Sequence, residues 1–461
     1  GDLLREWWSG WRSAGLGQSG GSPTVAFVVG ALNWMTFGSE GLVRTVVFLA
    51  PLGVGALGAW RLLRGVGSPL ARTAVLVAYL ANPIPYNAIA EGRWQALVVW
   101  ALAPSIVARL AAAGAFEPFA DTERAERSVL QQTFALGLIV AIGATVAPVI
   151  VLVVALLAVV MAVVVGAGSR GNLGRLGVVT LGSLAVSALV HLPWTISVLG
   201  GANRVEVLLG NAAGRGAPIG VSEALVFDTG AHGTFLSGGL LVAIAAAVLI
   251  TVGPVFRWTL FGLVSALVGF GLVALAGLLA PSVALPVPEV LLVPAALGAA
   301  LCVGVAAEAI TTTLSGTAFG IRHVAAVLCA VGVLVAVLPL LLDSLNGRWD
   351  APTSDVDDAL ESLSTGAEIE NFRTLWIGDA DAVAQAGWRF GDGMKFAVST
   401  GVSSGLPDLF PPAKGAGEAE LARLLSDVRR GETSRVGASL AQFGIRYVVV
   451  QERLAPLPYG R

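Results

Sequence analysis

The stretch Asn-Pro-Ile-Pro-Tyr-Asn-Ala-Ile-Ala-Glu-Gly-Arg-Trp, residues 82–94, is a polar interruption between two apolar runs. Pro83 and Pro85 lack a backbone donor and restrict the residue before each of them, so one helix cannot continue unbroken through both. The chain is therefore expected to turn here, at the surface of a bilayer. Ionic groups are costly near hydrocarbon, which makes Glu91 and Arg93 candidates for function.

The composition predicts a polytopic membrane protein. Of the 461 residues, 56% are hydrophobic and only 13% are charged, and the mean hydropathy is +0.80, whereas soluble domains are about 25% charged. The net charge of −2 gives no case for a nucleic-acid partner. Cys302 and Cys329 both fall inside apolar runs, and the three histidines lack the spacing of metal ligands, so neither a disulfide framework nor a metal site is indicated.

Apolar windows of about 20 residues mark the expected membrane spans. They predict ten spans, near residues 42–63, 68–82, 93–112, 128–146, 148–166, 176–198, 235–253, 258–280, 288–308 and 320–342. Arginines recur in every second connection, and basic loops are normally cytoplasmic. This assignment puts both ends of the chain and the turn at residues 83–93 on the extracytoplasmic side of the plasma membrane.

The same pattern predicts three regions: residues 1–41 form an extracytoplasmic first loop with interfacial helices, residues 42–342 form the transmembrane domain, and residues 343–461 form a small extracytoplasmic α/β domain. In the first, Trp7, Trp8 and Trp11 recur at helical spacing, as in an amphipathic helix at the headgroup level. In the last we expect strands at 372–378, 394–399 and 446–451, the third one buried, and helices at 418–430 and 434–443. The chain opens without an initiator Met or a signal sequence, so we expect it to be a piece of a longer protein.

Two groups of residues near the turn and the start of the chain carry candidate chemistry. Asp2 and Glu6 lie one helical turn apart, which suits either a general base or metal-binding carboxylate at the membrane surface, or the solvated face of an interfacial helix. Arg93 suits the grip of an anionic phosphate, but with Glu91 it also suits an ion pair at a membrane boundary. Tyr86 and Trp94 suit either the stacking of a sugar ring or an aromatic belt.

The outer loop at residues 200–234 holds a second set. Asp228 and His232 are four residues apart, as in a general-base couple or simply a loop turn. Arg204 and Arg215 would add positive potential for a phosphate or pyrophosphate. His191, near the end of the sixth span, is expected to be structural. The sequence has no Walker loop, no dinucleotide fingerprint opening a helix, no Gly-x-Ser-x-Gly and no His-Glu-x-x-His, so neither ATP use nor nucleotide-sugar chemistry is expected.

Taken together, the Trp/Gly-rich first loop, the segment at 86–94, the ten spans and the closing Phe-Gly-Ile-Arg-Tyr-Val-Val-Val at 443–450 resemble a known family. They are similar to actinobacterial polytopic glycosyltransferases of the GT-C type, in particular arabinofuranosyltransferase-like proteins. They are also similar to the membrane half of large two-part proteins that carry a family 2 glycosyltransferase domain.

The resemblance implies that a sugar passes from a polyprenyl-phosphate donor to a cell-wall glycan acceptor on the outer face, with membrane lipid as a further partner. In that family a carboxylate of the first outer loop acts as base or metal ligand, and Asp2 and Glu6 match that location. The one cofactor that the resemblance suggests is a divalent cation held by such a carboxylate. The C-terminal domain would hold the acceptor glycan.

Two other classes of function compete with this one. A non-catalytic membrane anchor for a fused or partner glycosyltransferase fits the small number of carboxylates in the outer loops. A transporter or flippase of lipid-linked sugars would need polar residues at mid-membrane and broken helices around a central site. The mid-span positions are almost all Ala, Val, Leu and Gly, which disfavours transport.

Overall fold

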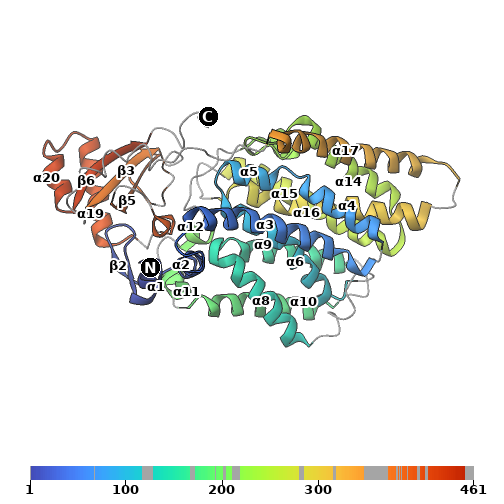
Figure 1. Cartoon of the computed structure of the whole chain (residues 1–461), viewed down its shortest axis with the longest axis horizontal. Coiled ribbons are helices and arrows are strands. Elements are labelled where there is room, and N and C mark those ends of the chain that lie inside the picture. The colour runs from blue at the N-terminus through green and yellow to red at the C-terminus, as the bar shows by residue number, and fades with distance from the viewer. Residues whose placement is uncertain are drawn as a thin grey trace.

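The computed structural model shows a long helical bundle with a small C-terminal sheet region at one end, which we call the C-terminal domain (Figure 1). It describes residues 2–66, 68–116, 128–166, 172–192, 194–200, 204–209, 219–279, 285–314, 318–346, 372–379, 383, 385, 387–391, 393–401, 405–410 and 414–451. The longer helices of the bundle are α3 (Glu40–Leu62), α4 (Pro69–Leu80), α6 (Trp94–Ala113), α8 (Val129–Val146), α9 (Ile150–Gly166), α10 (Leu173–Val190), α14 (Gly239–Ile250), α15 (Phe256–Leu279), α16 (Pro288–Ala309) and α17 (Ile321–Asn346).

Short elements connect these helices. They are α1 (Asp2–Ser9), β1 (Trp11–Arg12), β2 (Gln18–Ser19), α2 (Thr24–Met35), η1 (Arg64–Val66), α5 (Ile84–Ala90), α11 (Trp194–Gly200), α12 (Arg204–Leu209), α13 (Val221–Leu225), η2 (Phe235–Gly238), η3 (Gly253–Val255) and the π-helical turn η4 (Ile310–Leu314). α1 and α2 confirm helices in the first loop. Trp11 is not part of the predicted amphipathic helix, because α1 ends at Ser9 and Trp11 lies in β1.

Seven of the described helices are long and apolar enough to cross a membrane. Each of the ten predicted spans contains a helix, but α4, α9 and α14 have only 12, 17 and 12 residues. A helix of 12 residues is about 18 Å long, short of the roughly 30 Å hydrocarbon core. The class of helical membrane protein is therefore confirmed, and the count of ten spans stays a prediction.

Helix α16 is the centre of the bundle. α16 forms the first part of the apolar segment Pro288–Leu314, and 94% of the most apolar 18 residues of this segment are buried. The helix packs against α15, α4, α14 and α6. α15 and α16 meet backbone to backbone, because a Cβ added at Gly262 would stand 2.7 Å from the carbonyl oxygen of Gly298. By contrast, most residues in the apolar segments of α3, α10 and α17 are not buried in the protein, as expected of helices that face lipid.

The C-terminal domain is a four-stranded sheet with the strand order β4-β5-β3-β6. Its elements are β3 (Arg373–Asp379), β4 (Trp388–Arg389), β5 (Met394–Thr400), η5 (Leu406–Leu409), α19 (Ala416–Arg429), α20 (Val436–Ala441) and β6 (Ile445–Gln451). β3 pairs antiparallel with β5 and parallel with β6. The prediction of a buried last strand is wrong. β6 lies at a sheet edge, and Val450 on it is 67% exposed.

The N-terminal hairpin is docked on this domain. The N–H of Leu16 donates to Glu418 Oε1 at 3.1 Å, and Arg373 Nη2 donates to the carbonyl of Leu16 at 3.0 Å. The guanidinium of Arg12 donates to the carbonyl of Phe410. The first and last regions of the chain therefore share one end of the molecule (Figure 1).

Candidate functional site

The turn that interrupts the apolar sequence is a short helix followed by a reversal. α5 begins where Asn82 Oδ1 accepts a hydrogen bond from the N–H of Ile84 at 3.0 Å. Gly92 has a φ of +65°, a conformation that favours glycine, and it directs the chain into α6. Asn87 on α5 and Glu91 at its end are four residues apart, so they lie on one face of the helix.

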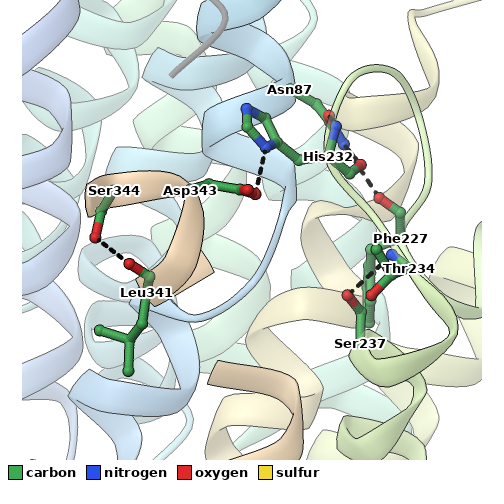
Figure 2. A network of polar contacts seen from close by, with 8 residues as sticks. All are labelled: Asn87, Phe227, His232, Thr234, Ser237, Leu341, Asp343 and Ser344. Atoms are coloured by element: carbon green, nitrogen blue, oxygen red, sulfur yellow. Dashed lines mark hydrogen bonds and ion pairs between the residues drawn. The ribbon is translucent and has the colours of Figure 1, made fainter. Parts of the chain in front are cut away.

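Asn87 holds the loop before α14 in place (Figure 2). Its Nδ2 donates to the carbonyls of His232 at 2.6 Å and Phe227 at 3.2 Å, and its Oδ1 accepts from the N–H of His232 at 2.6 Å. Asn87 is fully buried. One amide side chain therefore satisfies both backbone groups of His232 and fixes the position of that residue.

His232 is paired with Asp343 from the end of α17, with Nδ1 and Oδ2 3.2 Å apart (Figure 2). A carboxylate only accepts hydrogen bonds, so Nδ1 carries the hydrogen, and in the neutral imidazole Nε2 is then the basic nitrogen. The His232 side chain is 3% exposed and that of Asp343 is 43% exposed. Tyr86 presents its ring at 73° to the imidazole, 6.2 Å away, and burial raises the pKa of its hydroxyl. This geometry is that of a base oriented by a carboxylate.

Arg93 is engaged by two carboxylates. Its Nη1 lies 2.5 Å from Glu289 Oε1, in the first turn of α16, and its Nη2 lies 3.7 Å from Glu91 Oε2. The Glu289 side chain is fully buried and that of Arg93 is 12% exposed. A buried carboxylate needs such a partner, so one role of Arg93 is to hold the start of α16 against the turn.

The His232–Asp343 pair and the ion pairs of Arg93 belong to one cluster. A Cβ added at Gly230, in the His232 loop, would lie 3.0 Å from Glu91 Oε1 and 3.4 Å from Asn87 Oδ1. The side chains of α5 therefore pack directly on the loop that carries His232. We call the six residues that these contacts connect the polar cluster: Asn87, Glu91, Arg93, His232, Glu289 and Asp343.

Three buried polar atoms in and beside the polar cluster have no hydrogen-bond partner in the part of the chain that the structure describes. They are Asn82 Nδ2, Gln95 Nε2 and Glu289 Oε2. Buried polar atoms are normally satisfied, so each one that is not requires an explanation. A polar ligand or ordered water at this end of the bundle would provide the missing partners.

Two other predicted residues, Trp94 and Asp228, lie beside the polar cluster. Trp94 begins α6 and is half-buried. The N–H of Asp228 donates to the carbonyl of Glu223 at 2.9 Å, and its backbone leaves no room for a Cβ at Gly233. Arg204 opens α12, but its side chain lies outside the described residues, as does all of Arg215.

The two carboxylates of the first loop are placed differently. Glu6 accepts hydrogen bonds from the N–H of Ser13 at 3.0 Å and its hydroxyl at 2.9 Å, so it closes the N-terminal hairpin and belongs to the junction with the C-terminal domain. Asp2 begins α1, and its side chain is outside the described residues. His191 is structural as expected: Nδ1 contacts Thr24 Oγ1 at 2.8 Å and Nε2 contacts the carbonyl of Ala141 at 3.0 Å.

Among the described side chains, no group of three His, Cys, Asp or Glu residues is placed to hold a metal ion. Cys302 and Cys329 are both buried and free. The divalent cation that the family resemblance implies therefore stays a prediction, tied to Asp2.

Sequence reasoning missed three members of the polar cluster. Glu289 and Asp343 are carboxylates at the two ends of long apolar runs, the kind of position that is costly unless it serves a contact or a function. The sequence alone therefore contained a signal for Glu289 and Asp343. Asn87 stands inside the polar stretch, and its spacing of four residues from Glu91 was the only indication of its role.

No protein-family model matches the chain, and no curated protein matches it either. The fold defines the class: a helical membrane protein with a small sheet domain at one end.

Proposed function

We propose that the chain is a membrane glycosyltransferase, or the membrane half of one, that transfers a sugar from a polyprenyl-phosphate donor to a cell-envelope glycan on the outer face. The observation that carries this proposal is the polar cluster itself. It joins a histidine–carboxylate pair to an arginine at the end of the bundle beside the C-terminal domain (Figure 1). A lipid-linked donor carries its own leaving group, so the absence of nucleotide motifs is consistent with this chemistry.

His232 is the proposed general base. Transfer to a glycan needs the acceptor hydroxyl to lose its proton as the bond to the sugar forms, and a positioned base contributes about 10²–10⁴-fold to such a step. Asp343 orients the imidazole through Nδ1 and stabilises the imidazolium that forms. Asn87 fixes the backbone of His232, so the imidazole is already in position before the substrate binds.

Arg93 is the proposed contact for the donor phosphate. A guanidinium has five N–H donors, and the short contact with Glu289 uses only Nη1, so other donors can meet phosphate oxygens. Arg93 lies beside two carboxylates, Glu289 and Glu91, and their negative charge disfavours the binding of an anion. The phosphate therefore has to compete with Glu289 for the guanidinium.

Transfer measured with the full chain in nanodiscs, from a radiolabelled polyprenyl-phosphate sugar, tests the base. We expect His232→Gln and Asp343→Asn each to lower the rate by about 10²-fold or more while donor binding is kept. His323→Gln, on the same helix as Asp343 but at its other end, is the control and should transfer normally. Asp2→Asn tests the first-loop carboxylate that the family resemblance implies. Normal transfer by His232→Gln would rule out the base.

Binding of a short-chain prenyl phosphate tests Arg93 separately. We expect Arg93→Gln to weaken binding by about tenfold, or about 1.4 kcal/mol. Glu289→Gln should strengthen binding, because it removes the carboxylate that competes for the guanidinium. Arg322→Gln, at the opposite end of the bundle, is the matched control. If Arg93→Gln binds like the control, Arg93 is structural only.

A non-catalytic anchor remains the second candidate, and one observation favours it. Arg93 and Glu6 are both engaged by protein groups, Glu289 and Ser13, as structural residues would be. An anchor predicts that a fused or partner glycosyltransferase keeps its rate when His232, Asp343 and Asp2 are substituted together. A lost rate in that triple variant would exclude it.

A further inference from the structure

The C-terminal domain has an open groove of about 600 Å³ between the β4–β5 hairpin and helix α19. It lies in a different domain from the polar cluster. Ala419 and Ala422 of α19 and Phe390 beside β4 are among its lining residues, and Phe390 is 7% exposed. The volume lies within the range of 300–1,000 Å³ that is typical of small-molecule sites.

One face of α19 turns toward the groove. Ala419, Arg423, Ser426 and Arg430 all line it, at the spacing of 4, 3 and 4 residues that keeps side chains on one side of a helix. The other face of α19 packs Leu421 and Leu425 into the core of the domain, so the orientation of the helix is fixed. The arginines are therefore presented by a rigid element.

The hairpin turn is fixed against the end of the same helix. A Cβ at Gly391 would collide with the guanidinium of Arg429, and the positive φ of +63° also requires glycine there. The groove thus has two packed walls, with Arg389 standing on the hairpin side.

The charge of the groove departs from that of the chain, which has 28 basic and 30 acidic residues. Four cations line it: Arg389, Lys414, Arg423 and Arg430. The single lining carboxylate, Asp427, is already held by Arg430 Nη2 at 2.6 Å. Within the described residues no carboxylate contacts Arg389, Lys414 or Arg423, all of which are exposed.

From this arrangement we infer that the groove binds a small ligand carrying phosphate groups, such as a phosphorylated saccharide. Arg430 is engaged by two carboxylates, Asp427 and Glu432. The phosphate would therefore meet Arg389, Arg423 and Lys414, because arginine forks recognise phosphate oxygens by paired hydrogen bonds and lysine adds a point charge. Phe390 and the two alanines supply an apolar floor on which the uncharged part of the ligand can rest. Phosphate can come from a soluble ligand or from a lipid headgroup, and the two sources are separable by experiment.

Inorganic pyrophosphate is the minimal soluble probe. Titration by calorimetry into the full chain in phosphatidylcholine nanodiscs should show binding, and Arg423→Gln and Lys414→Gln should each weaken it about tenfold. Arg435→Gln, an exposed arginine of the same domain outside the groove, is the matched control and should bind within about twofold of the unaltered chain. Thermal unfolding of each variant checks that the domain stays folded.

The second arm mixes the same nanodiscs with phosphatidylglycerol vesicles and measures co-sedimentation. Association that Arg423→Gln abolishes, without pyrophosphate binding, assigns the phosphate source to lipid. Pyrophosphate binding without vesicle association assigns it to a soluble ligand. The inference is overturned if neither probe binds, or if Arg423→Gln and Arg435→Gln behave alike. None of these readouts depends on glycosyl transfer, so this result and that of the proposed function can fail independently.

Discussion

At the scale of single residues, a buried polar side chain needs defined partners. Glu289 and Asn87 are fully buried, and each is held by such partners. Asp408 in the C-terminal domain is only 7% exposed. The pKa of its carboxyl is raised to about 7, mainly by burial and also by the nearby Glu6, while the hydrogen bond from the N–H of Gly405 acts to lower it. Asp408 therefore couples the junction between the first loop and the C-terminal domain to pH.

The sign of this coupling follows from the raised pKa. An unfolded Asp ionises near its ordinary pKa of about 3.9, whereas folded Asp408 keeps its proton up to about 7. The folded state then binds more protons between these values, so stability should fall as the pH rises from about 4 to about 7 and level off above.

Asp408→Asn should remove most of this dependence, because the amide resembles the protonated carboxyl and can still accept from Gly405. Thermal unfolding of the C-terminal domain, followed by tryptophan fluorescence between pH 4.5 and 8, measures it. Asp427→Asn, a 41% exposed carboxylate of the same domain, is the control. An unaltered slope in Asp408→Asn would show that other groups carry the pH dependence.

At the scale of elements, two helix pairs of the bundle meet through close backbone contacts rather than through large interdigitating side chains. α15 and α16 approach through Gly262 and Gly298, and α14 and α17 approach through Gly239 and Gly332. Small residues let helix backbones come together where lipid removes the hydrophobic driving force. Because α16 carries Glu289 and α17 carries Asp343, these contacts also set the position of both carboxylates.

Gly262→Ala should destabilise the bundle, because its Cβ would meet the carbonyl of Gly298 at 2.7 Å and Cys302 Sγ at 2.8 Å. Overpacking of this kind costs about 1–3 kcal/mol. Gly271→Ala, on the same helix, meets nothing within 4 Å and should be neutral or slightly stabilising. The midpoint of thermal unfolding in detergent compares the two, and equal midpoints would contradict the close contact.

At the scale of the whole molecule, the polar cluster, the N-terminal hairpin and the C-terminal domain gather at one end of the bundle (Figure 1). α17 runs from this end to the opposite one, about 1.5 Å per residue. Asp343 therefore stands roughly 33 Å from Ile321, where α17 begins. This arrangement is what the proposed outer-face chemistry requires.

Cysteine labelling of intact cells tests the sidedness. Single substitutions Ala231→Cys, in the His232 loop, and Ser434→Cys, in the C-terminal domain, are both exposed and should react with an impermeant maleimide. Ala318→Cys, at the opposite end, should react only after lysis. The native Cys302 and Cys329 are buried, which keeps the background low. Labelling of Ala231→Cys and Ser434→Cys from opposite sides would exclude the proposed mechanism.

The sequence by itself determined the helical membrane class, the helix at each apolar window and the order of strands and helices in the tail, because hydrophobic periodicity and proline breaks act locally. It also marked the turn at residues 82–94, since ionic groups stand out against apolar neighbours. Only the tertiary structure decided that His232 pairs with Asp343 and Arg93 with Glu289, and that β6 is an edge strand. Those contacts join residues 111 and 196 positions apart, and their partners are chosen by how the helices pack, a property that no local pattern encodes.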